Sequence, residues 1–243
     1  MKIIGVIPAR YKSSRFPGKP LADICGKPMI WWVYQQAKKV KEFSEVYVAT
    51  ESEIVKDACE KLNINVVMTA DTHPTGTDRV GEVAQKIPAD LYVIWMGDEP
   101  LIKSENVSEL ISVFKQQHGV SACMLTTKFH NPVDVVNTTT IKLAVNNNND
   151  LIFMSRSPIP FPKAALDFEY KKNMGAYAMT KEALDFFLKT PVGAIERAEE
   201  IELLRLLENH KLVKVVEVDS DSMSVDTQKD LMRISAIIKE KGK

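Results

Sequence analysis

The sequence has little cysteine, and its cysteines form no common motif. Cys25, Cys59 and Cys123 are an odd number, lie far apart in the chain and include no CxxC pair. This spacing argues against a disulfide framework and against a zinc site. It is typical of a reduced, intracellular protein whose free cysteines pack in the core.

The chain also lacks net charge and any long apolar run. Lys plus Arg and Asp plus Glu number 32 each, so no global basic field would attract nucleic acid or an anionic membrane. No stretch approaches the roughly 18 apolar residues that a membrane span needs. The apolar residues 3–7 are followed at once by Pro8 and Arg10, which argues against a signal peptide. We therefore expect a cytoplasmic protein that binds neither nucleic acid nor membrane.

Two familiar phosphate-binding motifs are missing as well. GxxxxGK[ST] does not occur, and no GxGxxG follows the first apolar run, which argues against a dinucleotide oxidoreductase. What remains is an ordinary globular composition, 45% hydrophobic and 26% charged, over 243 residues. This composition is typical of a single domain.

Apolar runs of strand type and of helix type alternate in the first half of the chain. Strands are predicted at residues 3–7, 45–50, 65–68 and 91–96, and helices at 29–40, 54–62 and 77–87, the last capped by Thr75 or Thr77. This alternation indicates βαβ units and a mostly parallel sheet with right-handed crossovers.

The second half has a more irregular pattern. Strands are predicted at residues 120–127, 141–145, 150–154, 175–179 and 213–218, and helices at 181–188, 195–208 and 227–239. The asparagine run 146–149 predicts a hairpin or loop, and the proline-containing segment 157–171 predicts an irregular arm or surface loop.

A cationic loop follows the first predicted strand. Arg10, Lys12, Arg15 and Lys19 lie within ten positions of one another. Such crowding beside a buried strand is costly unless an anion compensates the charges, and a triphosphate would do so. Arginine forks, the lysine ammonium and the hydroxyls of Ser13 and Ser14 are suitable donors. The alternative is a solvated basic loop without a ligand.

An acidic loop follows the strand predicted at 91–96. Asp98 stands there between Gly97 and Pro100, and ligands of open parallel sheets bind beyond the carboxyl ends of the strands. We therefore expect this loop and the cationic loop to meet, with Mg²⁺ bridging carboxylate and phosphate oxygens. Asp226, after a second strand-like run, is a candidate second carboxylate. Its alternative role is to cap the last helix.

Several segments together resemble the 3-deoxy-manno-octulosonate (Kdo) cytidylyltransferases, and they occur in family order over nearly the whole chain. These are residues 7–11 with 28–30, 67–69 with 75–79, 97–102, 155–160, 175–177 and 225–227. The resemblance implies an α/β fold of the nucleotide-diphospho-sugar transferase type. In that fold a Rossmann-like, mostly parallel sheet with flanking helices carries a smaller dimerisation subdomain. We expect one domain over 1–243, with 120–190 forming much of the acceptor and dimerisation portion.

The same resemblance implies an activity and a set of site residues. The enzyme would transfer CMP from CTP to the anomeric hydroxyl of a 2-keto-3-deoxy sugar acid and release pyrophosphate, using Mg²⁺, as a homodimer, for lipopolysaccharide or capsule synthesis. The implied catalytic residues are Arg15, Lys19, Asp98 and Asp226, with Asp98 and Asp226 as the metal ligands. The implied nucleotide-binding residues are Ala9, Arg10, Ser13, Ser14, Arg15, Lys19, Thr69, His73, Thr75, Gly76, Thr77 and Arg79. The implied acceptor-binding residues are Met96, Arg156, Asn173, Tyr177 and Glu202.

The sequence departs from the family pattern on the acceptor side. Met96 and Leu203 stand where the family usually has glutamine, and Asn173 stands where it has histidine. Loss of hydrogen-bonding partners for a hydroxylated substrate can change discrimination by orders of magnitude. The acceptor could therefore be Kdo, a modified Kdo, a nonulosonic acid or a phosphonate. The protein could also transfer a nucleotide from UTP or GTP, or bind a nucleotide without turnover.

Overall fold

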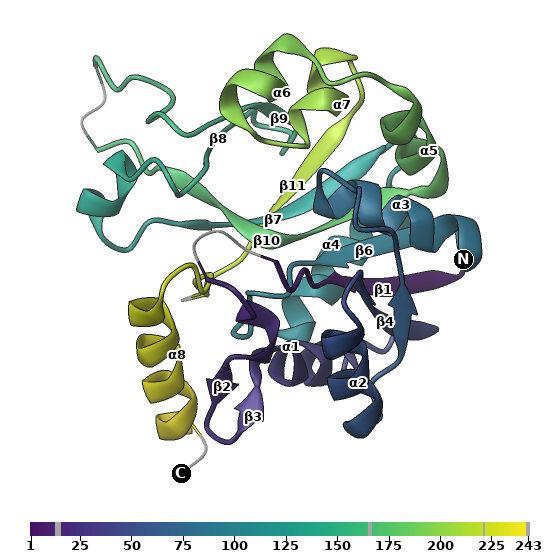
Figure 1. Cartoon of the computed structure of the whole chain (residues 1–243). Coiled ribbons are helices and arrows are strands. Elements are labelled where there is room, and N and C mark those ends of the chain that lie inside the picture. Colours follow the sequence, from purple (N-terminus) through teal and green to yellow (C-terminus); the bar gives the residue numbers. More distant parts are fainter. Residues whose placement is uncertain (13–15, 165–166, 221, 242–243) are drawn as a thin grey trace. The chain divides into compact units, whose positions relative to one another are not determined.

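The structure, a computed structural model, describes residues 1–12, 16–164, 167–220 and 222–241. The chain divides into a first unit, Met1–Ser108 with Asp221–Lys243, and a second unit, Glu109–Ser220. Helix α4 (Ser104–Gln116) begins in the first unit and ends in the second (Figure 1). This helix was not predicted from the sequence.

The first unit contains a sheet of parallel strands. Their order is β6 (Leu91–Trp95), β1 (Ile3–Pro8), β4 (Glu45–Thr50) and β5 (Val66–Met68). Every residue of β1 and β6 is buried, as expected for continuous apolar runs in a sheet covered on both faces. The predicted parallel arrangement is confirmed, and the carboxyl ends of these strands lie at one edge of the sheet.

The predicted helices of this unit are present, and the first three alternate with its strands as expected. They are α1 (Met29–Ala37), α2 (Glu53–Lys61), α3 (Gly76–Lys86) and α8 (Gln228–Lys241), with a 3₁₀ turn, η1 (Lys19–Leu21), and a small hairpin, β2 (Asp23–Ile24) with β3 (Lys27–Pro28). Of the two predicted caps of α3, Thr75 is the one used, because its hydroxyl accepts the Asp78 N–H at 3.1 Å.

An apolar cluster connects the hairpin, α1 and the last helix. Its buried members are Ile24, Met29, Val225, Leu231 and Ile234. In Figure 1, α8 lies beside the β2–β3 hairpin, although the two are about 200 residues apart in the chain. Val225 is fully buried in this cluster. The segment that contains Asp226 is therefore held against the remainder of the first unit, to which it belongs.

The second unit contains a mixed sheet. Strand β7 (Ala122–Lys128) lies between β11 (Val213–Glu217), which is parallel to it, and β10 (Lys171–Thr180), which is antiparallel. Strand β8 (Lys142–Val145) pairs with β10 and with β9 (Leu151–Ser155). The remaining elements are the 3₁₀ turn η2 (Pro132–Val136) and helices α5 (Lys181–Lys189), α6 (Ala194–Glu199) and α7 (Leu204–Glu208).

The prediction of one long helix over 195–208 was wrong. Helices α6 and α7 are separated at Glu200, whose φ of 52° lies in the left-handed region. The physical reason is Arg156, whose Nε donates to the Glu199 carbonyl at 2.7 Å and whose Nη2 donates to the Glu200 carbonyl at 3.2 Å. These carbonyls would otherwise continue the helix, so a side chain from another element ends it.

The strand expected before Asp226 is also absent. Residues 222–226 belong to no helix or sheet, and the Val225 N–H donates instead to the Asp98 carbonyl at 2.9 Å. Loop contacts, such as this bond and the one from Lys19 Nζ to the Val225 carbonyl, stand in place of the expected strand ladder, and the buried side chain of Val225 anchors the segment.

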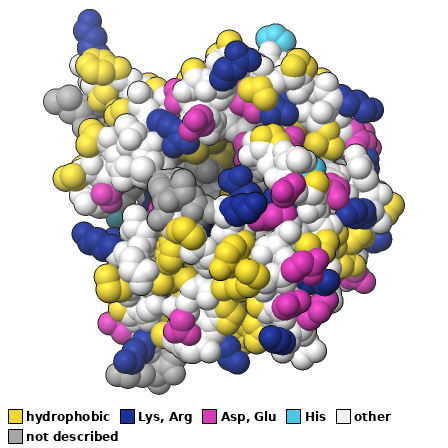
Figure 2. All heavy atoms as spheres, viewed as in Figure 1, with side chains coloured by type: hydrophobic (Ala, Val, Ile, Leu, Met, Phe, Trp, Pro, Cys, Tyr) yellow, Lys and Arg dark blue, Asp and Glu magenta, His cyan; other side chains and the backbone are white. Residues whose placement is uncertain are grey.

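All three cysteines are free, but only two lie in the core. Burial raises the pKa of the Cys59 and Cys123 thiols to about 12, so both are unreactive at neutral pH. Cys25 is exposed on the β2–β3 turn, contrary to the expected core position. Within the described ranges, no helix is long and apolar enough to cross a membrane. Basic and acidic side chains are interspersed on the face shown in Figure 2.

Candidate functional site

The cationic loop is anchored where it leaves β1. The Tyr11 N–H donates to Glu51 Oε1 at 3.0 Å, and the Tyr11 carbonyl accepts the Gly18 N–H at 2.9 Å. Gly18 has a φ of 70°, which glycine adopts without a steric penalty, so the chain turns back to its starting point. Arg10 is exposed on this loop. The predicted residues Ser13, Ser14 and Arg15 lie outside the described part of the chain.

Lys19 brings the cationic loop to two carboxylates. Its Nζ is 2.6 Å from Asp98 Oδ2 and 3.7 Å from Asp226 Oδ1, and it donates to the Val225 carbonyl at 3.0 Å. The side chains of Lys19, Asp98 and Asp226 are 18%, 21% and 33% exposed, so the group is reachable from solvent but not fully hydrated. The structure therefore brings together the cationic loop and the acidic loop, as we expected from the sequence.

Asp98 is positioned by a close approach of two backbones. A Cβ at Gly97 would lie 2.9 Å from the Pro8 carbonyl oxygen, so only glycine allows the loop after β6 to lie against the loop after β1. Asp226 is positioned by Val225 and receives a hydrogen bond from Ser224 Oγ at 3.2 Å. The first turn of α8 is closed by Thr227 and Asp230, whose side chain accepts the Thr227 N–H at 2.8 Å.

A second loop connects β5 with α3 and contains Thr69, His73 and Thr75. Glu82 of α3 holds it, because Glu82 Oε2 is 2.5 Å from His73 Nε2 and accepts the Ala70 N–H at 2.8 Å. Burial by itself raises the pKa of Glu82. Hydrogen bonds from Lys86, His73 and Ala70 outweigh burial and lower that pKa to about 2. Glu82 is therefore ionised over the whole physiological range.

The start of α3 lies against the other two loops. A Cβ at Gly76 would be 3.5 Å from Pro8 Cγ and 3.8 Å from Met96 Sδ, so these residues are neighbours. Thr77 is fully buried just behind them. Met96, predicted to contact the acceptor, is thus placed beside the residues predicted to contact the nucleotide.

Arg79 is fully buried beneath these loops. Its Nη2 lies 3.1 Å from Glu51 Oε2, and its Nη1 donates to the Thr69 hydroxyl and to the Ala70 carbonyl, the latter at 3.3 Å. Burial lowers the pKa of Arg79, and the Glu51 carboxylate opposes this shift. The guanidinium is thus engaged by protein groups on two loops.

The other predicted acceptor residues lie in the second unit. Tyr177 donates from its hydroxyl to Glu202 Oε2 at 3.4 Å. Asn173 lies on β10, and its Oδ1 is buried without a hydrogen-bond partner in the described part of the chain. Arg156 donates to three carbonyls, of Thr138, Glu199 and Glu200, so only part of its fork remains for a ligand.

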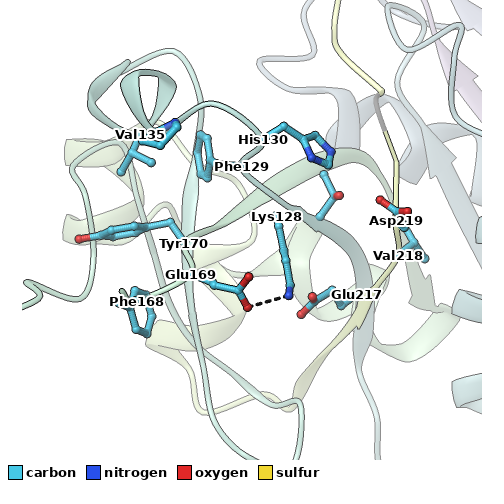
Figure 3. Close-up of a pocket in the computed structure, with 12 residues that line it drawn as sticks. Lys128, Phe129, His130, Val135, Phe168, Glu169, Tyr170, Glu217, Val218 and Asp219 are labelled. Atoms are coloured by element: carbon cyan, nitrogen blue, oxygen red, sulfur yellow. Dashed lines mark hydrogen bonds and ion pairs between the residues drawn. The ribbon is translucent and has the colours of Figure 1, made fainter. Parts of the chain in front are cut away.

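The second unit also contains a cavity of about 720 Å³ (Figure 3). Lys128 and Glu169 pair with each other across it at 2.6 Å, and the rings of Phe168 and Tyr170 form part of its wall. None of the predicted site residues lines this cavity. The cavity is therefore not part of the candidate active site.

The donor set at Asp98 and Asp226 fits a hard divalent cation. Within the described residues no cluster of three or more His, Cys, Asp or Glu side chains could hold a metal, which excludes a closed all-protein cage there. Two partly exposed carboxylates are, however, what Mg²⁺ takes from a protein when phosphates and water supply its other ligands.

Two carboxylates of this region were not predicted from the sequence. Glu51 follows the buried strand β4 directly, just as Asp98 follows β6, so the pattern that indicated Asp98 also holds for Glu51. Glu82 lies on the face of α3 that also carries Asp78 and Lys86, and its spacing alone is typical of a solvated surface. Only its tertiary contacts with His73 and Ala70 distinguish Glu82 from an ordinary solvated surface residue.

A parallel α/β sheet with a cationic loop facing two carboxylates fits the class of nucleotidyltransferases, and similarity to known proteins places the chain in that class. Residues 4–215 match the cytidylyltransferase family. The 3-deoxy-manno-octulosonate cytidylyltransferase of Escherichia coli is 37% identical over 98% of this chain and 96% of its own. The 8-amino-3,8-dideoxy-manno-octulosonate cytidylyltransferase of Shewanella baltica is also 37% identical, over 96% of this chain and 97% of its own.

A solved structure agrees with these relatives. A CMP:2-keto-3-deoxy-manno-octonic acid synthetase complexed with CTP superimposes with a TM-score of 0.95 at 36% identity, over 99% of this chain and 100% of the other. The chain belongs to the 3-deoxy-manno-octulosonate cytidylyltransferase family and is a cytidylyltransferase.

Proposed function

We propose that this enzyme transfers CMP from CTP to the anomeric hydroxyl of a 2-keto-3-deoxy sugar acid, Kdo or a modified Kdo, and releases pyrophosphate. The observation that carries the proposal is the contact of Lys19 with Asp98 and Asp226. It lies at the carboxyl edge of the sheet, in a chain whose relative of 36% identity was solved with CTP.

The predicted residues divide the work of the reaction. The anomeric oxygen of the sugar acid forms a bond with the α-phosphorus of CTP. The bond from that phosphorus to the oxygen between the α- and β-phosphates breaks, and pyrophosphate leaves. The anomeric hydroxyl loses its proton in the same reaction. Arg10, Arg15 and Lys19 would hold the triphosphate, so Lys19 exchanges a carboxylate for a phosphate oxygen when CTP binds. Ala9, Ser13, Ser14, the loop from Thr69 to Thr75 and the start of α3 at Gly76 and Thr77 would hold the rest of the nucleotide. Arg79, which is fully buried, would support these groups from beneath. Catalysis then rests on position and charge neutralisation.

Mg²⁺ is the cofactor that this arrangement suits. Asp98 and Asp226 would hold it with oxygens of the substrate. When bound, Mg²⁺ neutralises charge on the attacking and leaving oxygens. Without CTP, Lys19 supplies the positive charge that keeps the two carboxylates together.

The acceptor side supports a modified sugar acid. Met96 offers no donor, and the buried Oδ1 of Asn173 needs one, so a substrate amine or hydroxyl would satisfy it. Relatives named for 8-amino-3,8-dideoxy-manno-octulosonate are as similar to this chain as those named for the unmodified acid. Arg156 would contact the carboxylate, while Tyr177 and Glu202 would contact hydroxyls.

Pyrophosphate release tests this proposal. We would measure it with CTP and Mg²⁺ against Kdo, 8-amino-3,8-dideoxy-manno-octulosonate, a nonulosonic acid and a phosphonate, and we expect the highest kcat/KM for the amino sugar. A clear preference for unmodified Kdo would remove the altered acceptor. If no acceptor gives pyrophosphate release but CTP raises Tm, the result would favour a nucleotide-binding protein without turnover. Thermal shifts with UTP and GTP test the choice of nucleotide.

We further propose a cytoplasmic homodimer that supplies an activated sugar acid for lipopolysaccharide or capsule synthesis. The cytoplasm is where CTP is available. Exposed apolar side chains of the second unit support the dimer, since Phe161, Val133 and Val136 are 83%, 73% and 69% exposed and an isolated chain would hydrate them. All three lie within 120–190, the portion that we assign to dimerisation and acceptor binding within a single functional domain.

A further inference from the structure

The buried pair of Glu51 and Arg79 touches two loops at once. One oxygen of Glu51 accepts the Tyr11 N–H at 3.0 Å, and the other lies 3.1 Å from Arg79 Nη2. Tyr11 closes the base of the cationic loop through its bond with Gly18. The Glu51 carboxylate thus fixes Tyr11, the residue at which the cationic loop begins and against which its far end at Gly18 closes.

The other end of the pair holds the loop after β5. Arg79 Nη1 donates to the Thr69 hydroxyl and to the Ala70 carbonyl. The Thr69 N–H in turn donates to the Thr50 carbonyl at 2.9 Å, directly before Glu51. Protein groups therefore form a continuous chain of contacts from Tyr11 to Ala70.

Stability alone is a poor reason for this arrangement. The Glu51 side chain is 8% exposed and that of Arg79 is fully buried, and buried ion pairs are often no better than an apolar replacement. The buried Nε of Arg79 also lacks a hydrogen-bond partner in the described residues. An unsatisfied buried donor costs about 1–3 kcal/mol, so the pair calls for another explanation.

We propose that Glu51 and Arg79 are positioning residues that fix the distance between the cationic loop and the loop from Thr69 to Thr75. CTP then meets two loops that are already in place and does not have to order them. This inference rests on the proposed function, because it assumes that these loops bind CTP. Neither side chain needs to touch the nucleotide.

The test compares Glu51→Gln with wild type and with Glu51→Asp. In Glu51→Gln the guanidinium keeps a polar neighbour but loses its counter-charge, and we expect the KM for CTP to rise about 10- to 100-fold with kcat changed less than about threefold. This split is expected when an interaction supports the ground state and the transition state equally. Glu51→Asp keeps the charge and should recover most of the affinity.

Glu196→Gln is the matched control. Glu196 and Arg205 form another buried ion pair, with Oε1 and Nη2 2.6 Å apart, in the second unit. Its loss should lower Tm and leave the KM for CTP unchanged. Hydrogen exchange at residues 10–12 and 69–75 provides a second readout, which should accelerate in Glu51→Gln and not in Glu196→Gln. Hydrogen exchange can be read from the folded molecules alone, so the test still works if Glu51→Gln lowers the folded fraction.

The outcomes separate the two proposals. If wild type binds no CTP, the proposed function fails whatever the variants do. If wild type binds CTP, and Glu51→Gln matches Glu196→Gln in both KM and hydrogen exchange, the positioning role is wrong.

Discussion

At the scale of single residues, the main feature of the site is that the ammonium group of Lys19 faces two carboxylates. Asp98 and Asp226 both approach Lys19, so one positive charge meets two negative charges in a partly exposed site. Unlike charges at this separation attract by a few kcal/mol near a protein surface, while the carboxylates repel each other. These three groups therefore leave one negative charge uncompensated among themselves, which favours an added cation.

Asp98→Asn tests the metal carboxylate. Asparagine keeps the size of the side chain but removes the negative charge, and we expect kcat to fall at least about 100-fold, as is typical when an electrostatic contact of the transition state is lost. Pyrophosphate release measures the rate, and circular dichroism checks the fold. Asp90→Asn is the control, because Asp90 accepts the Lys2 N–H at the surface. Near-normal turnover in Asp98→Asn would remove Asp98 from the metal site.

Glu82 gives the protein a specific dependence on pH. Its pKa in the folded protein is about 2, below the ordinary value of 4.5, so its ionised form stabilises the fold above pH 4.5. That contribution is lost as the pH falls through 2. We expect Glu82→Gln to lower the free energy of unfolding at pH 7 by about 1–2 kcal/mol after allowance for solvent screening.

Urea unfolding between pH 7 and pH 2 measures this contribution. The difference between wild type and Glu82→Gln should shrink as the pH falls below 4.5. Glu60→Gln, at an exposed position of α2, serves as the control and should show no such trend. A difference that stays constant over the whole range would show that Glu82 acts through packing alone.

At the element scale, the start of α3 has both a structural and a binding role. Thr75 caps the helix through the Asp78 N–H, and the positive end of a helix dipole favours a bound anion. The same residue belongs to the loop that we expect to contact CTP. A change at Thr75 should therefore affect stability and nucleotide affinity together.

Thr75→Ala separates these roles when it is compared with Thr180→Ala. Thr180 caps α5 by the same geometry, with its hydroxyl 3.1 Å from the Ala183 N–H. Each substitution should cost about 1 kcal/mol of stability in urea unfolding. Only Thr75→Ala should also raise the KM for CTP. An equal effect of both variants on KM would assign Thr75 a structural role only.

The break between α6 and α7 illustrates how one element shapes another. Arg156, at the end of β9, takes the carbonyls of Glu199 and Glu200, while Glu199 accepts hydrogen bonds from the Ser155 hydroxyl and the Arg156 N–H. The turn between the helices presents Glu202, which meets Tyr177 of β10. Two predicted acceptor residues are thus brought together by a break that helix periodicity does not reveal.

At the scale of the whole molecule, the exposed apolar side chains of Phe161, Val133 and Val136 bear on assembly. We expect light scattering to give twice the 27.3 kDa mass of one chain, and we expect Phe161→Ser to shift the protein toward the monomer. Removal of a large apolar side chain from an interface costs affinity in proportion to the surface that it buries. Ile54→Ser, at an exposed apolar position of α2, is the control. An unchanged mass in Phe161→Ser would place the interface elsewhere.

The sequence by itself determined the parallel sheet of the first unit and its two polar loops. Short apolar runs rich in β-branched residues, such as 3–7, favour a strand buried on both faces, and helical runs between such strands favour parallel pairing. The carboxyl ends of the strands then lie at one edge, so the convergence of Lys19 with Asp98 followed from order along the chain.

Only the tertiary structure decided which polar groups act at a distance. The break at Glu200 escaped prediction because periodicity does not contain the contacts that stop a helix. Helix α4 was missed although Val107, Leu110 and Ile111 have helical spacing and are buried. Arg79 was expected to contact the nucleotide and Glu51 was not predicted at all, and only folding buries the two side chains against each other. Asp226 was a candidate from the sequence, and the burial of its apolar neighbour Val225 brings it within 3.7 Å of Lys19, so the free energy of hydrophobic burial holds this charge in place.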